Sequence, residues 1–210
     1  SIYGSIPFQF HSKKTLQGDI SISGIGDASI MGIYELVKSK NSFHQINAGL
    51  GVKIPLGKFD EKGITGVNPS FQLGTGSWDY QLAMNYKFQK DRFAMLINTD
   101  YTIKTENKKH YQFGDQWNYS ATAFYRLWNS TQSVLSGKIG LQGEVFDWNR
   151  QFSEVMPKTA GSALYGKAGF EISLNKLSLG TELMLPAYTN LASGDIEAKS
   201  RFSLFLNFGL

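Results

Sequence analysis

Apolar side chains alternate with polar or small ones, residue by residue, along much of this chain. In residues 46–54, isoleucine, alanine, leucine and valine occupy one set of alternate positions, and asparagine, glycine and lysine occupy the other. Residues 80–88 repeat the pattern with tyrosine, leucine, methionine and phenylalanine. A period of two is typical of a β-strand with one apolar and one polar face, whereas a helix would spread these residues around its axis. The alternation therefore predicts an all-β protein.

The same pattern predicts about ten strands in one domain that spans residues 1–210. A chain of 210 residues suits a single domain of this kind. Two strands alternate less cleanly, because Ile33 and Phe124 fall on the polar face. The predicted strands lie near residues 2–10, 27–38, 43–55, 78–89, 92–104, 116–128, 134–147, 162–174, 177–187 and 197–210.

The connections between these strands alternate strictly between long and short, with a long one first. The short ones are residues 39–42, 89–91, 128–133 and 175–176, and the long ones are residues 11–26, 56–77, 105–115, 147–161 and 188–196. In an up-and-down meander this order gathers every long loop at one end, as in outer-membrane barrels. A β-sandwich with Greek-key connections has no reason to keep it. We therefore predict an antiparallel up-and-down transmembrane β-barrel in the bacterial outer membrane, with periplasmic termini and extracellular long loops.

Aromatic residues gather near both ends of the predicted strands, on the apolar face. Tyr34 and Trp128 lie near short connections, whereas Phe8 and Tyr80 lie near long ones. Positions in the middle of strands, such as Leu50, are mostly aliphatic or small. Two aromatic belts around an aliphatic band are expected where rings sit at the two membrane interfaces. Soluble sandwiches also accumulate aromatic residues at strand ends, so this feature alone does not decide the class.

The composition argues against several chemistries. The chain has no cysteine, which excludes disulfides, thiol chemistry and cysteine metal sites. Its histidines, His11, His44 and His110, fall in separate loops and turns without the spacing of a metal site, so we predict no metal and no cofactor. The net charge of +4 is not gathered into a basic stripe, which argues against nucleic-acid binding.

Two glycine-rich motifs precede predicted strands. The first is Ser-Gly-Ile-Gly-Asp at residues 23–27, and the second is Gly-Thr-Gly-Ser-Trp-Asp at residues 74–79, which follows a Gly-x-Gly-x-Lys-x-Pro-x-Gly stretch at residues 49–57. Glycine suits tight turns at a barrel rim, and aspartate can cap such turns through its side chain. The predicted rim-turn residues are Gly24, Gly26, Asp27, Gly74, Gly76 and Asp79.

Over the first 90 or so residues these motifs resemble the outer-membrane barrel family named after the meta-pathway of phenol degradation, whose members are often labelled as transporters. The resemblance implies an outer-membrane location and passage of small or apolar molecules. It implies no catalytic residues. Family barrels usually begin with a further strand pair, so the resemblance also implies twelve strands if that pair is missing here.

The inward face of the predicted barrel carries charges of both signs. Unpaired charge in a narrow interior is costly, so opposite charges at matching heights are expected to pair across or between strands. A barrel of about ten strands is only slightly wider than its side chains need, so these residues form either a salt-bridged plug or a narrow polar pore. The predicted lumen-lining residues are Glu35, Lys53, Lys87, Asp100, Arg126, Lys138, Glu144, Lys167, Glu171, Glu182 and Arg201.

These features predict a channel for passive passage of small solutes, surrounded by outer-membrane lipid, with diffusion past a charged constriction as its mechanism. The sequence does not identify the solute. A structural or accessory subunit bound to other outer-membrane proteins is the main alternative, and a filled lumen with an apolar docking face would favour it. A lipid-processing enzyme is the third hypothesis, since His11 is expected at the external rim and has serines near it in the sequence. These serines are Ser12, Ser21 and Ser23. We expect no enzymatic activity.

Overall fold

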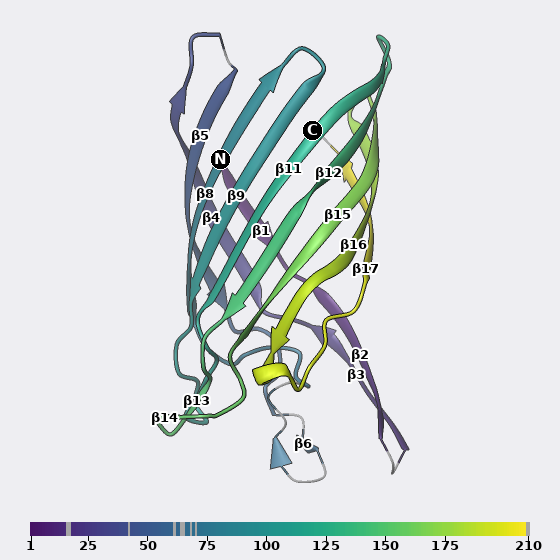
Figure 1. Ribbon diagram of the computed structural model, residues 1–210. Coiled ribbons are helices and arrows are strands. Elements are labelled where there is room, and N and C mark those ends of the chain that lie inside the picture. The colour runs from purple at the N-terminus through teal and green to yellow at the C-terminus, as the bar shows by residue number, and fades with distance from the viewer. Residues whose placement is uncertain are drawn as a thin grey trace.

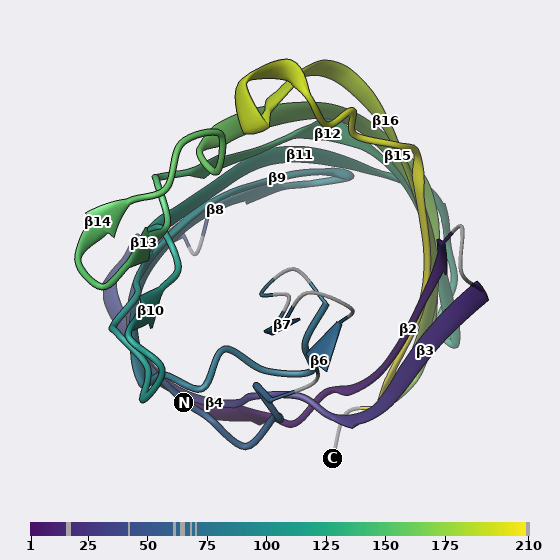
Figure 2. The ribbon, with the colours of Figure 1, turned by 90° about the horizontal axis from the view of Figure 1, so that it is seen from below.

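Ten strands form one antiparallel sheet that curls into a barrel (Figures 1 and 2). The structure, a computed structural model, describes residues 1–15, 18–41, 43–60, 62–63, 66–67, 69 and 71–208. The strands follow one another along the sheet in chain order, so the predicted up-and-down barrel is confirmed. In that order they are β1 (Ile2–Ser5), β4 (Ala28–Lys38), β5 (His44–Ile54), β8 (Asp79–Lys90), β9 (Phe93–Ile103), β11 (Gln116–Asn129), β12 (Ser133–Phe146), β15 (Gly161–Leu174), β16 (Leu177–Leu191) and β17 (Arg201–Phe208).

The strands of the ten-stranded sheet from β4 to β16 are long enough to cross a bilayer. The shortest of them have 11 residues and the longest, β16, has 15. An 11-residue strand is about 36 Å long, and Figure 1 shows the strands steeply tilted against the barrel axis. A tilted strand of that length matches a hydrocarbon core of about 30 Å. The described residues include no helix that is long and apolar enough to cross a membrane.

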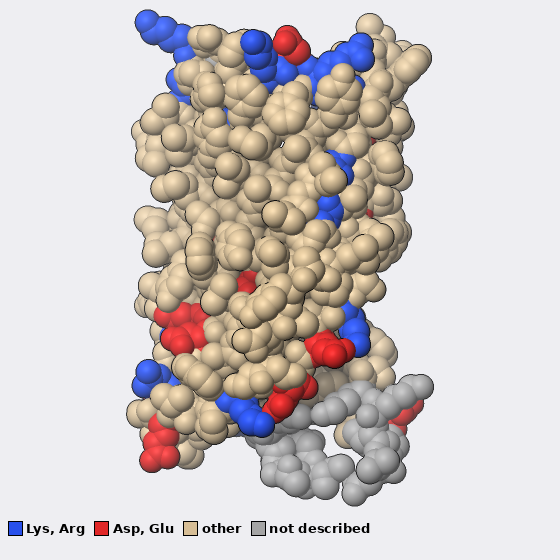
Figure 3. All heavy atoms as spheres, in the orientation of Figure 1, with Lys and Arg blue, Asp and Glu red and all other residues tan. Residues whose placement is uncertain are grey.

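The outer surface of the barrel is apolar, and its aromatic residues lie near the strand ends. Leu50 and Ile139, in the middle of their strands, are 70% and 68% exposed. Tyr34 and Trp128, near the short turns, are also exposed, as is Phe202 near the long loops. On the face shown in Figure 3, charged side chains gather toward the two ends, and the band between them is largely uncharged. This distribution matches the polarity profile of a membrane.

The first predicted strand and loop are wrong in detail. Strand β1 ends at Ser5, and the chain then forms a separate hairpin of β2 (Phe8–Thr15) and β3 (Gly18–Ile25), where the sequence predicted a strand to residue 10 and a loop. Pro7 has no N–H to donate to a ladder, so it interrupts the strand. The amide of Gly26 donates to the carbonyl of Pro7 at 2.8 Å and closes the base of the hairpin.

The long connections all lie at one end of the barrel, and several carry short strands (Figure 1). Among the described residues β10 (Tyr111–Gln112) pairs with β13 (Arg150–Gln151), which pairs with β14 (Glu154–Val155), so two successive loops are tied together. The connection between β5 and β8 carries β6 (Lys62–Gly63) and β7 (Gly66–Val67), which Figure 2 shows over the barrel opening. The 3-10 turn η1 (Ala192–Gly194) follows β16.

The sheet has two edges, at β1 and β17. No ladder joins these two strands within the part of the chain that the structure describes. The last strand was predicted from residue 197 but begins at Arg201, and the strand before it was predicted to residue 187 but extends to Leu191. Residues 209–210 lie outside the described residues.

Candidate functional site

The interior of the barrel is the candidate functional site. By strand alternation and register, the eleven predicted lumen residues share one face of the sheet with uncharged residues such as Asn85 and Asn98, which line a cavity. The sequence predicted that these charges pair across or between strands, and the structure shows which of them meet.

The first interior ion pair joins β12 to β16 and passes over the intervening strand β15. The ammonium of Lys138 lies 2.9 Å from a carboxylate oxygen of Glu182. Gly169 of β15 lies beneath this contact, and a Cβ added there would come within 2.9 Å of the Lys138 side chain. The glycine therefore leaves the space through which Lys138 reaches its partner.

A second ion pair spans a larger part of the wall, from β12 to β17. Both terminal nitrogens of Arg201 donate to the carboxylate of Glu144, at 2.5 and 3.0 Å. The guanidinium also lies 4.5 Å from the centre of the Tyr165 ring. Tyr165 is fully buried beside Ala163 and Met184. This side of the barrel, from β12 to β17, is therefore filled near its long-loop end.

Apart from Lys53, which is described below, the other predicted lumen charges have weaker or no partners. Glu35 accepts a hydrogen bond from Gln45, and Asp100 accepts one from Asn118 at 2.7 Å. Lys167 lies 3.5 Å from Gln142. No hydrogen bond or ion pair joins the side chains of the remaining three to another described residue. These three are Lys87, Arg126 and Glu171.

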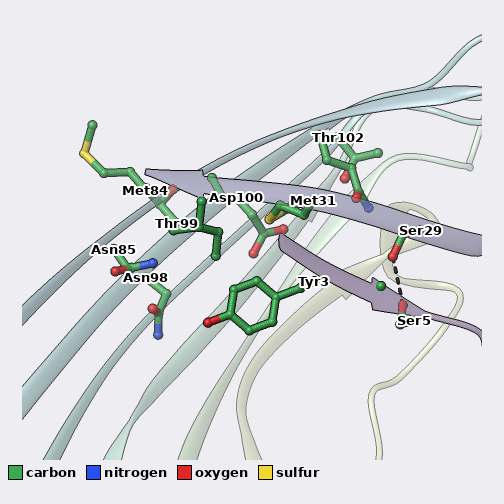
Figure 4. A pocket seen from close by; sticks show the side chains of 14 residues that line it. Tyr3, Ser5, Ser29, Met31, Met84, Asn85, Asn98, Thr99, Asp100 and Thr102 are labelled. Atoms are coloured by element: carbon green, nitrogen blue, oxygen red, sulfur yellow. Dashed lines mark hydrogen bonds between the residues drawn. The ribbon is translucent and has the colours of Figure 1, made fainter. Parts of the chain in front are cut away.

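Across the lumen, β5, β8 and β9 present amides instead of ion pairs. Asn47 donates to Asn85 at 2.7 Å, and Asn98 donates to Ser120 of β11 at 3.3 Å. A cavity of about 620 Å³ lies against this wall and is also lined by β1 and β4 (Figure 4). We call this cavity the lumen chamber. The sequence hypothesis missed its uncharged residues because it considered only charges, although the same alternation places Asn85 and Asn98 inward.

Four charged groups meet at the long-loop end of the chamber, where the strands enter the long loops. The ammonium of Lys53 lies 2.5 Å from Asp79 and 3.0 Å from Asp27, and the ammonium of Lys104 lies 3.5 Å from Asp79. Asp79 is fully buried, and the other three side chains are at most 14% exposed. We call these residues the mouth cluster. Its two lysines and two aspartates sum to zero charge.

The mouth cluster anchors the connection between β5 and β8, whose described residues, 55–60, 62–63, 66–67, 69 and 71–78, we call the mouth segment. Asp27 accepts hydrogen bonds from the amides of Gly57 and Thr75, at 3.0 and 2.8 Å, and from the Thr75 hydroxyl. Asp79 accepts one from the Ser77 hydroxyl at 2.9 Å. Both ends of the mouth segment are thus held against the barrel wall.

Each glycine of the predicted rim motifs lies against this arrangement. A Cβ at Gly74 would overlap Asp27 and the backbone of Gly57. Gly76 has φ of +70°, a conformation that favours glycine. Cβ atoms at Gly24 and Gly26 would come within 2.9 Å of Leu73 and 2.7 Å of Gln9. The sequence hypothesis placed Asp27 and Asp79 in separate turns, whereas the structure brings both to one lysine.

Lys104 was not singled out from the sequence. Its burial lowers its pKa, and the neighbouring ammonium of Lys53 lowers it further, while Asp79 opposes both effects. It directly follows β9 at the long-loop end, which is the only signal that could have placed it near Lys53.

The mouth segment is packed on its outer side by aromatic rings. Phe59 is buried and lies 6.0 Å from Tyr111 and 5.8 Å from Phe113, measured between ring centres. Burial raises the pKa of the Tyr111 phenol, whose oxygen accepts a hydrogen bond from Asn149. The loops after β9 and β12 therefore hold the mouth segment in place.

The three histidines remain apart. His11 bonds with Gln9, and His44 with Tyr86. His110 lies 2.6 Å from Glu106 in an exposed loop, so an acid–histidine pair does occur at the long-loop end of the barrel. No serine hydroxyl joins that pair among the described residues, and no group of three or more candidate metal ligands occurs there either.

An apolar exterior, a polar interior and an up-and-down meander define this protein as a β-barrel of the outer-membrane type. Residues 2–185 match the family model described as "MetA-pathway of phenol degradation", and the chain belongs to that family, as its motifs predicted. The fold is similar to the crystal structure of an outer membrane channel from Pseudomonas putida F1, with a TM-score of 0.75 and 15% sequence identity over 96% of this chain and 74% of that chain. No curated protein matches the sequence.

Proposed function

We propose that this protein is an outer-membrane channel through which small solutes diffuse passively. The lumen chamber carries the proposal, because a barrel that served only as a scaffold would fill its interior with side chains. About 620 Å³ of this interior is not filled. The similar fold of an outer membrane channel supports the same function.

In this proposal the long loops face outward and both termini face the periplasm. The arrangement follows the rule for outer-membrane barrels, which have short periplasmic turns and long external loops. A solute from outside then meets the mouth segment first, passes beside the mouth cluster, and enters the lumen chamber. The mouth segment narrows this path and keeps the conductance low.

Two interior ion pairs, and equal numbers of acidic and basic groups among the lumen charges with weaker or no partners, favour uncharged solutes. Lys138 is neutralised by Glu182, and Arg201 by Glu144. An ion that enters would lose part of its hydration without meeting a strong field of opposite sign. We therefore expect weak ion selectivity and better passage of uncharged molecules.

Bilayer recordings test the proposal. Folded protein added to a planar bilayer should give discrete current steps, and liposomes that contain it should swell in an isotonic solution of a small neutral solute. Heat-unfolded protein is the control. A folded barrel that gives neither current nor swelling would refute the channel and favour the accessory subunit.

A further inference from the structure

The two walls of the lumen chamber differ in chemistry. Strands β8 and β9 contribute a polar wall that includes Gln81, Asn85, Asn98 and Asp100. Strands β1 and β4 contribute Tyr3, Met31 and Ile33, which are largely apolar. Figure 4 shows the Tyr3 ring pointing into the space that Asn85, Asn98 and Asp100 border. A solute with one apolar face and one hydrogen-bonding edge can therefore satisfy both walls at once.

The polar wall retains unused hydrogen-bonding capacity. The Asn85 carbonyl oxygen accepts from Asn47, which leaves its amide group to donate. The Asn98 amide group donates to Ser120, which leaves its carbonyl oxygen to accept. One Asp100 oxygen accepts from Asn118, and no other described residue donates to its second oxygen. Donors and acceptors thus lie side by side, as a pair of neighbouring hydroxyl groups requires, because each hydroxyl both donates and accepts.

On the apolar wall, the serine hydroxyls are already satisfied. The hydroxyls of Ser5 and Ser29 bond to each other at 2.8 Å. Tyr3 is 58% exposed, so its ring face is available to a solute. Aromatic rings offer a flat apolar surface on which another ring can lie.

The charge of the chamber disfavours anions. Asp100 is the one formally charged group among the residues that line it. A carboxylate in this space would be repelled by Asp100 and would lose hydration without gaining a cationic partner.

We propose that the lumen chamber is a binding site for uncharged ring compounds that carry hydroxyl groups on adjacent carbons. The ring lies against Tyr3 and Met31, and its hydroxyl groups bond to Asn85, Asn98 and Asp100. This inference rests on the proposed channel function and adds to it a saturable site with a defined solute class. A simple cyclic diol and a sugar share this chemistry.

Block of the ion current tests the site directly. Cyclohexane-1,2-diol and glucose are titrated separately against single channels, and cyclohexanecarboxylate serves as the anionic probe of similar size. We expect at least one of the two hydroxylated rings to block saturably, and the carboxylate to need at least about tenfold higher concentration. The compound that blocks at lower concentration shows whether the site prefers a simple cyclic diol or a sugar.

Variants then locate the block. Asn98→Leu removes the unused carbonyl and should raise the half-blocking concentration by about tenfold, in the range of one lost hydrogen bond. Ser136→Ala, on β12 and outside the chamber lining, is the matched control and should leave it unchanged. Asp100→Asn removes the charge that repels the carboxylate, so the half-blocking concentration of the carboxylate should fall toward that of the diol.

The outcomes separate this inference from the channel function. If the channel conducts but neither hydroxylated ring blocks it, or if Asn98→Leu and Ser136→Ala shift block equally, the binding site is refuted and the channel stands. If the folded protein conducts no current and liposomes do not swell, both proposals fail.

Discussion

Removing one charge from the mouth cluster should destabilise the barrel strongly. The variant Asp79→Asn keeps the shape of the side chain and an oxygen that can accept from Ser77 and Thr105, which donate to Asp79 at 2.9 and 3.1 Å. What it removes is the negative charge that faces Lys53 and Lys104. The cluster then holds two ammonium groups and one carboxylate.

The size of the effect follows from burial. Two unit charges 3.5 Å apart, the separation of Lys104 and Asp79, attract by about 5 kcal/mol at an effective dielectric of about 20. Desolvation offsets part of this gain in the native protein, but removing one partner leaves the other buried without compensation, which typically costs about 3–5 kcal/mol. We expect a loss of that size in the free energy of unfolding.

Guanidinium unfolding in phospholipid vesicles, followed by tryptophan fluorescence, measures this loss. Asp60→Asn is the matched control, because it makes the same chemical change at an exposed position of the mouth segment. The double variant Asp79→Asn/Lys104→Met restores a neutral cluster of one lysine and one aspartate, and should recover most of the lost stability. Losses below about 1 kcal/mol for Asp79→Asn, or a double variant less stable than the single one, would refute the reasoning.

Three further predictions concern other parts of the molecule. Arg201→Gln leaves Glu144 without its cationic partner in the lumen, so the reversal potential in a salt gradient should shift toward cation selectivity; an unchanged potential would mean that ions do not pass this pair. Gly74→Ala should loosen the mouth segment and raise the conductance, because its Cβ would overlap the mouth cluster, whereas Gly166→Ala has open space around its Cβ and should behave as the parent does. Burial lowers the pKa of Lys104, so between that pKa and the ordinary value of 10.5 the folded protein binds fewer protons than the unfolded chain. The free energy of unfolding, measured relative to Lys104→Met, should therefore rise with pH in this range. A fall with pH would contradict the lowered pKa of Lys104.

Strand positions could be predicted from the sequence because each strand has one apolar and one polar face. The pattern in residues 46–54 and 80–88 reports this directly, and β5 and β8 lie where it indicates. Loop residues do not lie between lipid and lumen, so their sequence shows no alternating pattern from which a position could be predicted. The hairpin of β2 and β3 was missed because its ladder lies outside the barrel wall, where neither face is fixed by lipid or lumen.

The mouth cluster could not be predicted from the sequence, although three of its members lie in recognised motifs. Asp27, Lys53 and Asp79 are far apart in the chain, and their meeting depends on the register of β4, β5 and β8. Register is set by pairings that a single strand's pattern does not contain. The same reason explains why the contact between Arg201 and Glu144 could not be predicted. These residues are 57 positions apart in the sequence and lie on β17 and β12, with β15 and β16 between them, so they meet only through the register and curvature of the wall.

The most direct test of the channel is chemical block from inside the lumen chamber. The chain contains no cysteine, so a single introduced cysteine is the one site of reaction with a thiol reagent. Asn98→Cys places it in the chamber, and Ile97→Cys, one residue away, places it on the outer surface. If solutes pass through the chamber, a charged methanethiosulfonate reagent should reduce the conductance of Asn98→Cys and leave that of Ile97→Cys unchanged. Equal currents before and after complete modification of Asn98→Cys would contradict the account.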